Sequence, residues 1–199
     1  ITRELYHLFL KSKGVSTDTR SIEKGSIFFC LKGENFDGNN FATEALKKGA
    51  NYVVTDNHEL KNPKFIKVEN VLKALQKLST FHRSKLTNTI FIAITGSNGK
   101  TTTKELLHIV LNTGFKTIST SGNLNNHIGV PLTLLNIKQN SDFAIVEMGA
   151  NHVGEIDFLT NLIKPDLGYI TNFGKAHLEG FGGLKGVIKG KSELYNWLI

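Results

Sequence analysis

The sequence has no long apolar run, only one cysteine and no initiator methionine. Its apolar stretches are far shorter than the roughly 20 residues that a membrane-spanning helix needs. The first residues also lack the apolar core and cleavage site of a signal peptide. Because Cys30 alone cannot form an internal disulfide, the chain is typical of a reducing compartment. We therefore expect a cytoplasmic protein without a membrane span, either processed or part of a longer chain.

No run of basic residues with interleaved aromatic residues occurs, although 24 Lys and Arg residues outnumber 17 Asp and Glu residues. The net charge of +7 suits anionic ligands such as nucleotides, and it would also suit nucleic acid. Because the basic residues are spread along the chain, we expect a nucleotide ligand and no nucleic-acid partner. Internal repeats and low-complexity segments are missing as well.

Strand-like apolar runs alternate with amphipathic helical segments, which predicts an α/β fold with parallel sheets. In the first part we expect a helix that Asn70 caps, a helix over residues 41–49, and strands at 27–31, 52–55 and 65–68. From residue 90 onward the order strand, loop, helix repeats, with strands at 91–94, 116–119, 143–146 and 167–171. The helix after residue 100 is predicted to pack through Leu106, Leu107, Val110 and Leu111. The polar stretch 84–89 divides the chain into domains 1–86 and 87–199.

The most informative segment is residues 95–102, a Thr-Gly-Ser-Asn-Gly-Lys-Thr-Thr sequence directly after an apolar strand. Glycines let the backbone approach an anion closely, and the N–H groups of a following helix then face its charge. Lys100 is expected to reach the β- and γ-phosphates of ATP, and the Thr101 hydroxyl to bind Mg²⁺. The glycine spacing is shorter than in the generic phosphate loop, and a plain strand–turn–helix is the alternative. The predicted ATP-binding residues are Gly96, Ser97, Asn98, Gly99, Lys100, Thr101 and Thr102.

Two further polar residues follow predicted strands of the same sheet. Glu147 comes directly after the strand 143–146, and His177 follows the strand 167–171 after a short loop. Ligands of parallel sheets bind at the carboxyl ends of the strands, so these side chains indicate magnesium coordination near a nucleotide. Taken alone, a carboxylate at a strand end is usually a solvated or capping residue, and a lone histidine is more often structural. The Asn- and Gly-rich segment 121–131 is either a loop or a set of neutral ligand contacts.

Several motifs together resemble the Mur ligases, which build the peptide stem of the bacterial cell wall. The matching segments are residues 95–105, 122–126, 128–133, 147–156, 170–172 and 176–182. They are most similar to the branch that joins D-alanyl-D-alanine to UDP-N-acetylmuramoyl-tripeptide. In the amino-terminal part, residues 18–20 and 32–38 resemble the uridine-binding signatures of the family. His127 departs from the pattern, since an acidic residue is common there.

The resemblance implies an ATP-dependent carbon–nitrogen ligase of peptidoglycan precursor synthesis that works through an acyl phosphate. It implies a small amino-terminal uridine-binding domain, followed by an incomplete phosphate-loop domain with a parallel sheet. Roles in binding the UDP substrate carry over to Asp18, Thr19, Arg20, Asp37 and Gly38. The family has a further carboxy-terminal domain, so residues 1–199 alone are expected to be inactive. We expect a monomer that uses UDP-N-acetylmuramoyl-tripeptide and D-alanyl-D-alanine as substrates.

The resemblance also implies the catalytic and metal-binding residues. Catalytic roles carry over to Lys100, His177 and Lys191, and Mg²⁺ binding carries over to Thr101, Glu147, His177 and Lys191. Lys191 matches a family lysine that is carbamylated, which requires a lysine of lowered pKa. An ordinary exposed helix lysine is the alternative.

Two other functions remain open at this point. One is a sister ligase that adds a single amino acid, or glutamate as in folylpolyglutamate synthesis, although the folate ligases lack a uridine-binding domain. The other is a nucleotide-binding module without ligase activity, which the joint presence of Glu147, His177 and Lys191 disfavours.

Overall fold

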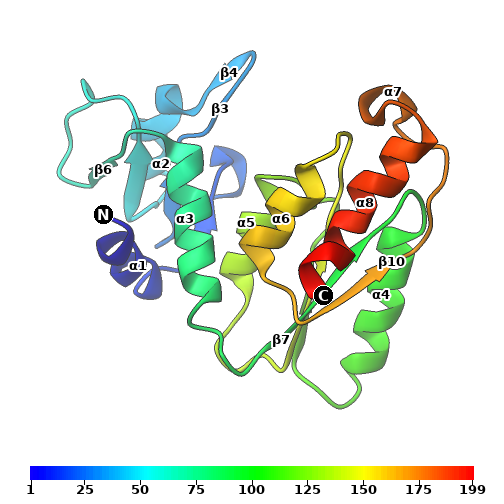
Figure 1. The fold of residues 1–199 in the computed structure, drawn as a ribbon. Helices are drawn as coiled ribbons and strands as arrows, with labels where there is room; N and C mark the ends of the chain where they lie inside the picture. The colour runs from blue at the N-terminus through cyan, green and yellow to red at the C-terminus, as the bar shows by residue number, and fades with distance from the viewer. The chain divides into compact units, whose positions relative to one another are not determined.

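The computed structural model describes residues 1–199, which divide into two compact units, Ile1–His82 and Arg83–Ile199. Each unit is an α/β structure with its own sheet, as the sequence predicts (Figure 1). The division falls a few residues before the boundary expected in the polar stretch 84–89. None of the helices is both long enough and apolar enough to cross a lipid bilayer.

The first unit is built on four parallel strands in the order β1-β2-β5-β6. All three residues of β2 are buried, as a strand covered on both faces requires. The predicted cap of the last helix is confirmed, because Oδ1 of Asn70 accepts a 2.8 Å bond from the Lys73 N–H. The elements are α1 (Thr2–Leu10), β1 (Val15–Ser16), β2 (Ile27–Phe29), β3 (Lys32–Gly33), β4 (Phe36–Asp37), α2 (Ala42–Lys47), β5 (Tyr52–Thr55), β6 (Phe65–Lys67) and α3 (Val71–Arg83).

The first unit differs from the sequence prediction in several places, beginning with α1 and β1, which the sequence analysis did not include. The strand predicted over 27–31 ends at Phe29, although Cys30 and Leu31 remain buried. The chain then turns back in a small antiparallel hairpin of β3 and β4, which the sequence analysis did not anticipate. The hairpin strands have two residues each, too few to show an alternating pattern.

The second unit has a parallel sheet in the order β10-β7-β9-β8, so β7 is flanked by β10 and β9. Because all four strands are parallel, their carboxyl ends lie at one edge, where the predicted site residues follow β7 and β10 or end β9. The elements are β7 (Ile90–Thr95), α4 (Lys100–Leu111), β8 (Thr117–Ser119), α5 (Gly129–Asn136), β9 (Phe143–Glu147), α6 (Glu155–Ile163), β10 (Leu167–Ile170), α7 (Leu178–Phe181) and α8 (Leu184–Leu198).

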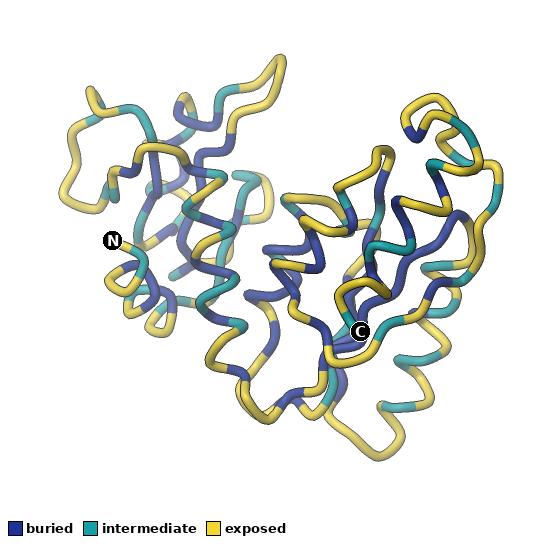
Figure 2. The backbone as a smooth tube through the Cα atoms, in the orientation of Figure 1, coloured by how far each residue is buried: buried dark blue, intermediate teal, exposed yellow.

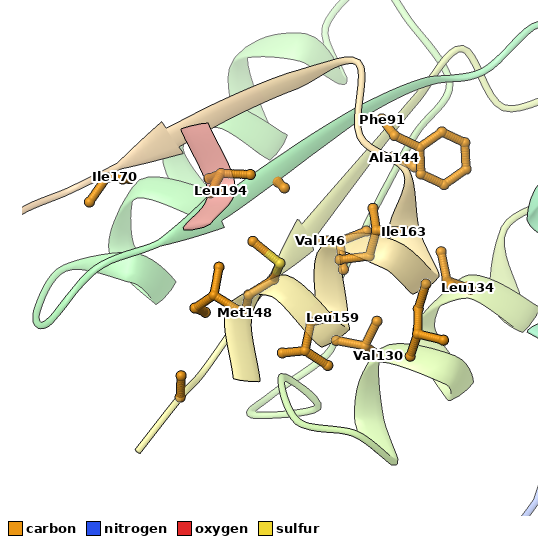
Figure 3. Packing of buried hydrophobic residues seen from close by; sticks show 14 of the residues in the cluster. Phe91, Val130, Leu134, Ala144, Val146, Met148, Leu159, Ile163, Ile170 and Leu194 are labelled. Atoms are coloured by element: carbon orange, nitrogen blue, oxygen red, sulfur yellow. The ribbon is translucent and has the colours of Figure 1, made fainter. Parts of the chain in front are cut away.

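The core of the second unit lies mainly on one face of its sheet. There α5, α6 and α8 contribute Leu134, Leu159 and Leu194, which pack with Phe91 and Val146 of the strands (Figure 3). On the other face, Ile92, Ile94 and Ile145 are covered by α4. The strands are therefore buried on both faces, which Figure 2 shows as dark blue tube through the middle of this unit.

The packing face of α4 corrects one prediction. Leu107 and Leu111 contact the sheet as expected, but Leu106 and Val110 are 60% and 65% exposed. Residues one apart on a helix differ in direction by about 100°, so the i, i+4 pair 107/111 forms one stripe and 106/110 another. The sequence shows a run of apolar residues, whereas the sheet contacts only one stripe of them.

Candidate functional site

The loop between β7 and α4 owes its shape to two glycines. Gly96 has φ 143°, and a Cβ there would lie 1.8 Å from Oγ1 of Thr171, so only glycine fits. Gly99 has φ 77° and forms the N-cap of α4 without a side-chain hydrogen bond to the helix. The N–H groups in the first turn of α4 are therefore left as donors for an anion, and the helix dipole adds to the attraction.

The segment after β10 holds this loop in place. The carbonyl and the side-chain oxygen of Asn172 accept bonds of 3.1 Å from the N–H groups of Ser97 and Asn98. The hydroxyl of Thr171 donates to the carbonyl of Asn98 at 2.6 Å. Two of the predicted ATP-binding residues, Ser97 and Asn98, thus use their N–H groups to fix the loop, which leaves phosphate donation to the residues after them.

Thr101 and Glu147 come together beside the loop. The Thr101 hydroxyl donates a 3.0 Å bond to Oε2 of Glu147, and the side-chain amide of Asn125 donates a 2.8 Å bond to Oε1. The carboxylate belongs to a residue only 1% exposed, at the end of β9. A buried carboxylate next to a hydroxyl offers the hard oxygen ligands that Mg²⁺ prefers.

A cavity of about 370 Å³ adjoins the loop and gathers the predicted catalytic residues. Its lining includes Gly96, Lys100, Asn125, His127, His177 and Lys191. Nζ of Lys100 donates to the carbonyl of Gly96 at 2.9 Å, so this ammonium lies over the loop. His177 has φ 54°, uncommon for a residue with a side chain, and such strain clusters at functional sites. Lys100, His177 and Lys191 thus share one cavity at the carboxyl edge of the sheet.

Lys191 differs from an ordinary helix lysine because it is only 2% exposed on α8. Burial, together with the nearby positive charge of Lys100, lowers the pKa of Lys191 to about 8. At neutral pH an appreciable share of its amine is therefore uncharged. This is the property that the expected carbamate requires, and the exposed-lysine alternative does not describe this side chain.

No group of three His, Cys, Asp or Glu side chains converges closely enough to hold a metal by itself. Mg²⁺ rarely needs such a cage, because it keeps several waters and binds through one or two carboxylates and substrate phosphates. Thr101 and Glu147 therefore fit a nucleotide-bound Mg²⁺, whereas they would be a poor site for a metal without the nucleotide.

A second cavity, of about 570 Å³, lies in the first unit. It is lined in part by Asp18, Thr19 and Arg20, which the sequence analysis assigned to the UDP substrate. Asp18 caps the 3₁₀ turn η1 (Thr19–Ser21) and pairs with the Arg20 guanidinium at 2.6 Å. Hydrogen bonds from the Arg20 side chain and backbone hold the pKa of Asp18 at about 2. The carboxylate therefore pairs with the arginine at the wall of the cavity.

Asp37 and Gly38 are not among the residues that line this cavity. Asp37 caps the 3₁₀ turn η2 (Gly38–Phe41), because its Oδ1 accepts bonds from the backbone and side-chain amides of Asn39. The lining includes instead Phe36 and Phe41, whose rings stack with centroids 5.4 Å apart. Sequence reasoning missed this aromatic pair, and its signal was a phenylalanine at each end of a polar turn.

Comparison with known proteins gives matches over both units. The family model described as the Mur ligase middle domain matches residues 94–198, and the model described as the Mur ligase family catalytic domain matches residues 11–83. The UDP-N-acetylmuramoyl-tripeptide–D-alanyl-D-alanine ligase of Bacillus subtilis (strain 168) is 43% identical over 188 residues. This match covers 93% of the chain but 41% of the relative, so the chain spans about two-fifths of its length.

Solved structures agree with these matches. The crystal structure of MurF from Acinetobacter baumannii is similar with a TM-score of 0.88 at 34% identity, over 100% of this chain and 46% of that one. The MurF ligase of Thermotoga maritima, solved in complex with ADP, gives a TM-score of 0.83 at 32% identity. That match covers 95% of this chain and 44% of the other.

Proposed function

The chain belongs to the Mur ligase family, and we propose that the whole protein joins D-alanyl-D-alanine to UDP-N-acetylmuramoyl-tripeptide at the expense of ATP. The similar proteins, of which this chain covers 41% to 46%, carry names for this reaction, and the motifs resemble the same branch. The observation that carries the proposal is the shared cavity of Lys100, His177 and Lys191 beside the pair of Thr101 and Glu147.

ATP is assigned to the loop of residues 96–102. The free N–H groups of the first turn of α4 suit its phosphates, and Lys100 adds a positive charge. Thr101 and Glu147 would hold Mg²⁺. His177 and carbamylated Lys191 would lie beside the carboxylate of the tripeptide substrate. Bound there, Mg²⁺ supplies the charge that lets two anions approach each other. The ADP complex of the Thermotoga maritima protein supports an adenine nucleotide as ligand.

The proposed reaction has two steps. The terminal carboxylate of the tripeptide attacks the γ-phosphorus of ATP, which forms an acyl phosphate and releases ADP. The amine of D-alanyl-D-alanine then attacks the acyl carbon, and the tetrahedral intermediate collapses to the amide with loss of phosphate and a proton. The contribution of this chain is to position the reactants and offset their negative charge through Lys100 and its neighbours.

The surroundings of Lys191 support its carbamylation. The uncharged amine bonds to the carbon of CO₂ and loses a proton, so a cation becomes an anion. Lys191 and Lys100 repel each other as two cations, which is one cause of the lowered pKa of Lys191. The carbamate removes this repulsion and replaces it with attraction, and it gives the cavity an oxygen ligand.

The UDP substrate is assigned to the cavity of the first unit. The stacked rings of Phe36 and Phe41 offer a platform for the uracil base, and Arg20 offers a planar donor for the diphosphate. Asp18 and Thr19 belong to the same wall, whereas Asp37 and Gly38 would act by shaping the turn that carries the rings. A cytoplasmic, monomeric enzyme stays a prediction, as does the inactivity of residues 1–199 alone.

Phosphate release from ATP by the full-length protein tests this function. We expect turnover that requires both UDP-N-acetylmuramoyl-tripeptide and D-alanyl-D-alanine, with little release when single amino acids replace the dipeptide. Turnover with a single amino acid in preference to the dipeptide would assign the protein to a sister ligase. Absence of any turnover with a well-folded, nucleotide-bound protein would leave only a binding module.

A further inference from the structure

Lys104 is completely buried, although it is a lysine on the helix that follows the phosphate loop. Charged side chains are almost never fully buried unless they are paired, because removal of the charge from water is costly. Its ammonium donates a 2.6 Å bond to the carbonyl of Thr120 and contacts Oε1 of Glu105 at 2.8 Å. The first partner lies 16 positions away, directly after β8.

Thr120 connects this ammonium to the proposed metal site. Its hydroxyl oxygen accepts a 2.9 Å bond from the backbone N–H of Glu147, and Thr120 itself is 1% exposed. The ladder between β8 and β9 ends with Ser119 opposite Ile145, two residues before Glu147. The N–H of Glu147 therefore depends on the Thr120 hydroxyl, since β8 offers it no partner.

These bonds close a ring that begins and ends on α4. From Lys104 the ring runs through Thr120 to the backbone of Glu147, and its carboxylate then accepts the bond from Thr101. Thr101 and Lys104 are three positions apart and so lie on the same side of the helix. The carboxylate is thus fixed relative to the phosphate loop by two bonds to the same helix, one direct and one through Thr120.

We propose that Lys104 is a positioning residue, which anchors Thr120 so that Glu147 is held in place to bind the Mg²⁺ of the nucleotide. This inference rests on the proposed function, in which Thr101 and Glu147 bind that ion. The pairing of Lys104 with Glu105 does not explain the burial, because Glu105 is 54% exposed and its charge is screened by water. The bond from Lys104 to the Thr120 carbonyl is buried, so it is the contact that accounts for the burial of the ammonium.

The test measures binding of a fluorescent ADP analogue to the full-length protein as Mg²⁺ is varied. For Lys104→Met we expect the Mg²⁺ concentration at half-maximal binding to rise by about tenfold, the usual effect of losing a group that orients a metal ligand. Affinity for the analogue without Mg²⁺ should stay within about twofold, because Lys104 is fully buried and does not line the cavity. Glu105→Gln is the matched control and should behave like the wild type.

A double-mutant cycle separates positioning from general stabilisation. Thr120→Val keeps the shape but removes the hydroxyl, and it should raise the Mg²⁺ requirement like Lys104→Met. The double variant should raise the Mg²⁺ requirement no more than the larger single change does, because both changes interrupt one chain of bonds. A purely structural role would lower the melting temperature without any change in the Mg²⁺ requirement.

The proposal is overturned if Lys104→Met needs no more Mg²⁺ than the wild type, or if Glu105→Gln raises the Mg²⁺ requirement as much. It is also overturned if the effects of Lys104→Met and Thr120→Val on the Mg²⁺ requirement simply add. Should Lys104→Met fail to fold, Thr120→Val alone decides, and an unchanged Mg²⁺ requirement overturns the proposal. A wild-type protein that binds the analogue without any dependence on Mg²⁺ would instead contradict the proposed function.

Discussion

The hydroxyl of Thr101 and the carboxylate of Glu147 lie 3.0 Å apart, although 46 positions separate them in the sequence. The bond joins the first turn of α4 to the last residue of β9. It brings together the two groups that the sequence could assign only separately, one in the phosphate loop and one at a strand end. Three consequences of this and the neighbouring contacts can be measured, and a fourth prediction concerns the cavity of the first unit.

Replacement of Thr101 by Val should abolish most ligase activity of the full-length protein. The change removes the hydroxyl that faces Glu147 while it keeps the shape of the side chain. We expect kcat/KM to fall by about 100-fold, the size of effect seen when a group that stabilises charge in the transition state is removed. Thr101→Ser keeps the hydroxyl and should remain within tenfold of the wild type. Equal activity of the two variants would show that the hydroxyl has no part in the reaction.

The two loop glycines should respond very differently to alanine. At Gly96 a Cβ would lie 1.8 Å from Oγ1 of Thr171, so Gly96→Ala must displace the loop or the segment after β10. We expect a loss of roughly 3 kcal/mol or more in stability and no measurable nucleotide binding.

Gly99→Ala is the control for stability, because a Cβ there meets nothing within 4 Å. Only the left-handed backbone opposes it, at a cost of about 1 kcal/mol. Thermal unfolding and binding of the fluorescent ADP analogue measure both variants. The reverse order of severity would mean that the loop has a different conformation.

Carbamylation of Lys191 should depend on pH in a predictable direction. Only the uncharged amine reacts, and the pKa of Lys191 is lowered to about 8. At constant dissolved CO₂, the reactive fraction should therefore rise about tenfold between pH 7 and pH 9 and then level off. Carbon-13 NMR with labelled CO₂ measures the carbamate signal. Lys191→Arg should remove the signal, whereas Lys185→Arg on the same helix should leave it unchanged. A signal that survives Lys191→Arg would place the carbamate elsewhere.

The aromatic pair of the first unit should contribute to binding of the UDP substrate. Phe36 is 48% exposed and lines the cavity with its ring stacked on Phe41. Loss of a base-stacking ring weakens binding by about 1–3 kcal/mol, so Phe36→Ala should raise the dissociation constant of UDP at least about fivefold. Isothermal titration calorimetry measures this, and Phe36→Tyr should bind as the wild type does. Unchanged affinity of Phe36→Ala would show that uracil lies elsewhere.

The sequence predicts those parts of the fold that local patterns determine. Apolar runs locate the strands at Ile27 and Ile90, and Asn70 marks the start of α3. The phosphate loop can be predicted for the same reason, since its backbone has positive φ angles at Gly96 and Gly99. In each case residues close together in the chain are sufficient to locate the feature, although distant Thr171 and Asn172 hold the loop in place.

Features that depend on distant partners could not be predicted from sequence. Leu106 and Val110 look like core residues, but the sheet contacts the neighbouring stripe of α4. Lys104 looks like a surface lysine, and its burial follows only from the position of Thr120. These side chains obtain their environment from tertiary packing, which periodicity does not encode.

The most direct test of the account is a crystal structure of the full-length protein with Mg²⁺ and a non-hydrolysable ATP analogue. The account predicts phosphates over the first turn of α4, Mg²⁺ bound by the Thr101 hydroxyl and the Glu147 carboxylate, and the γ-phosphate directed toward the cavity of His177 and Lys191. A nucleotide bound away from the loop at Gly99, or an ion that does not touch Glu147, would contradict it.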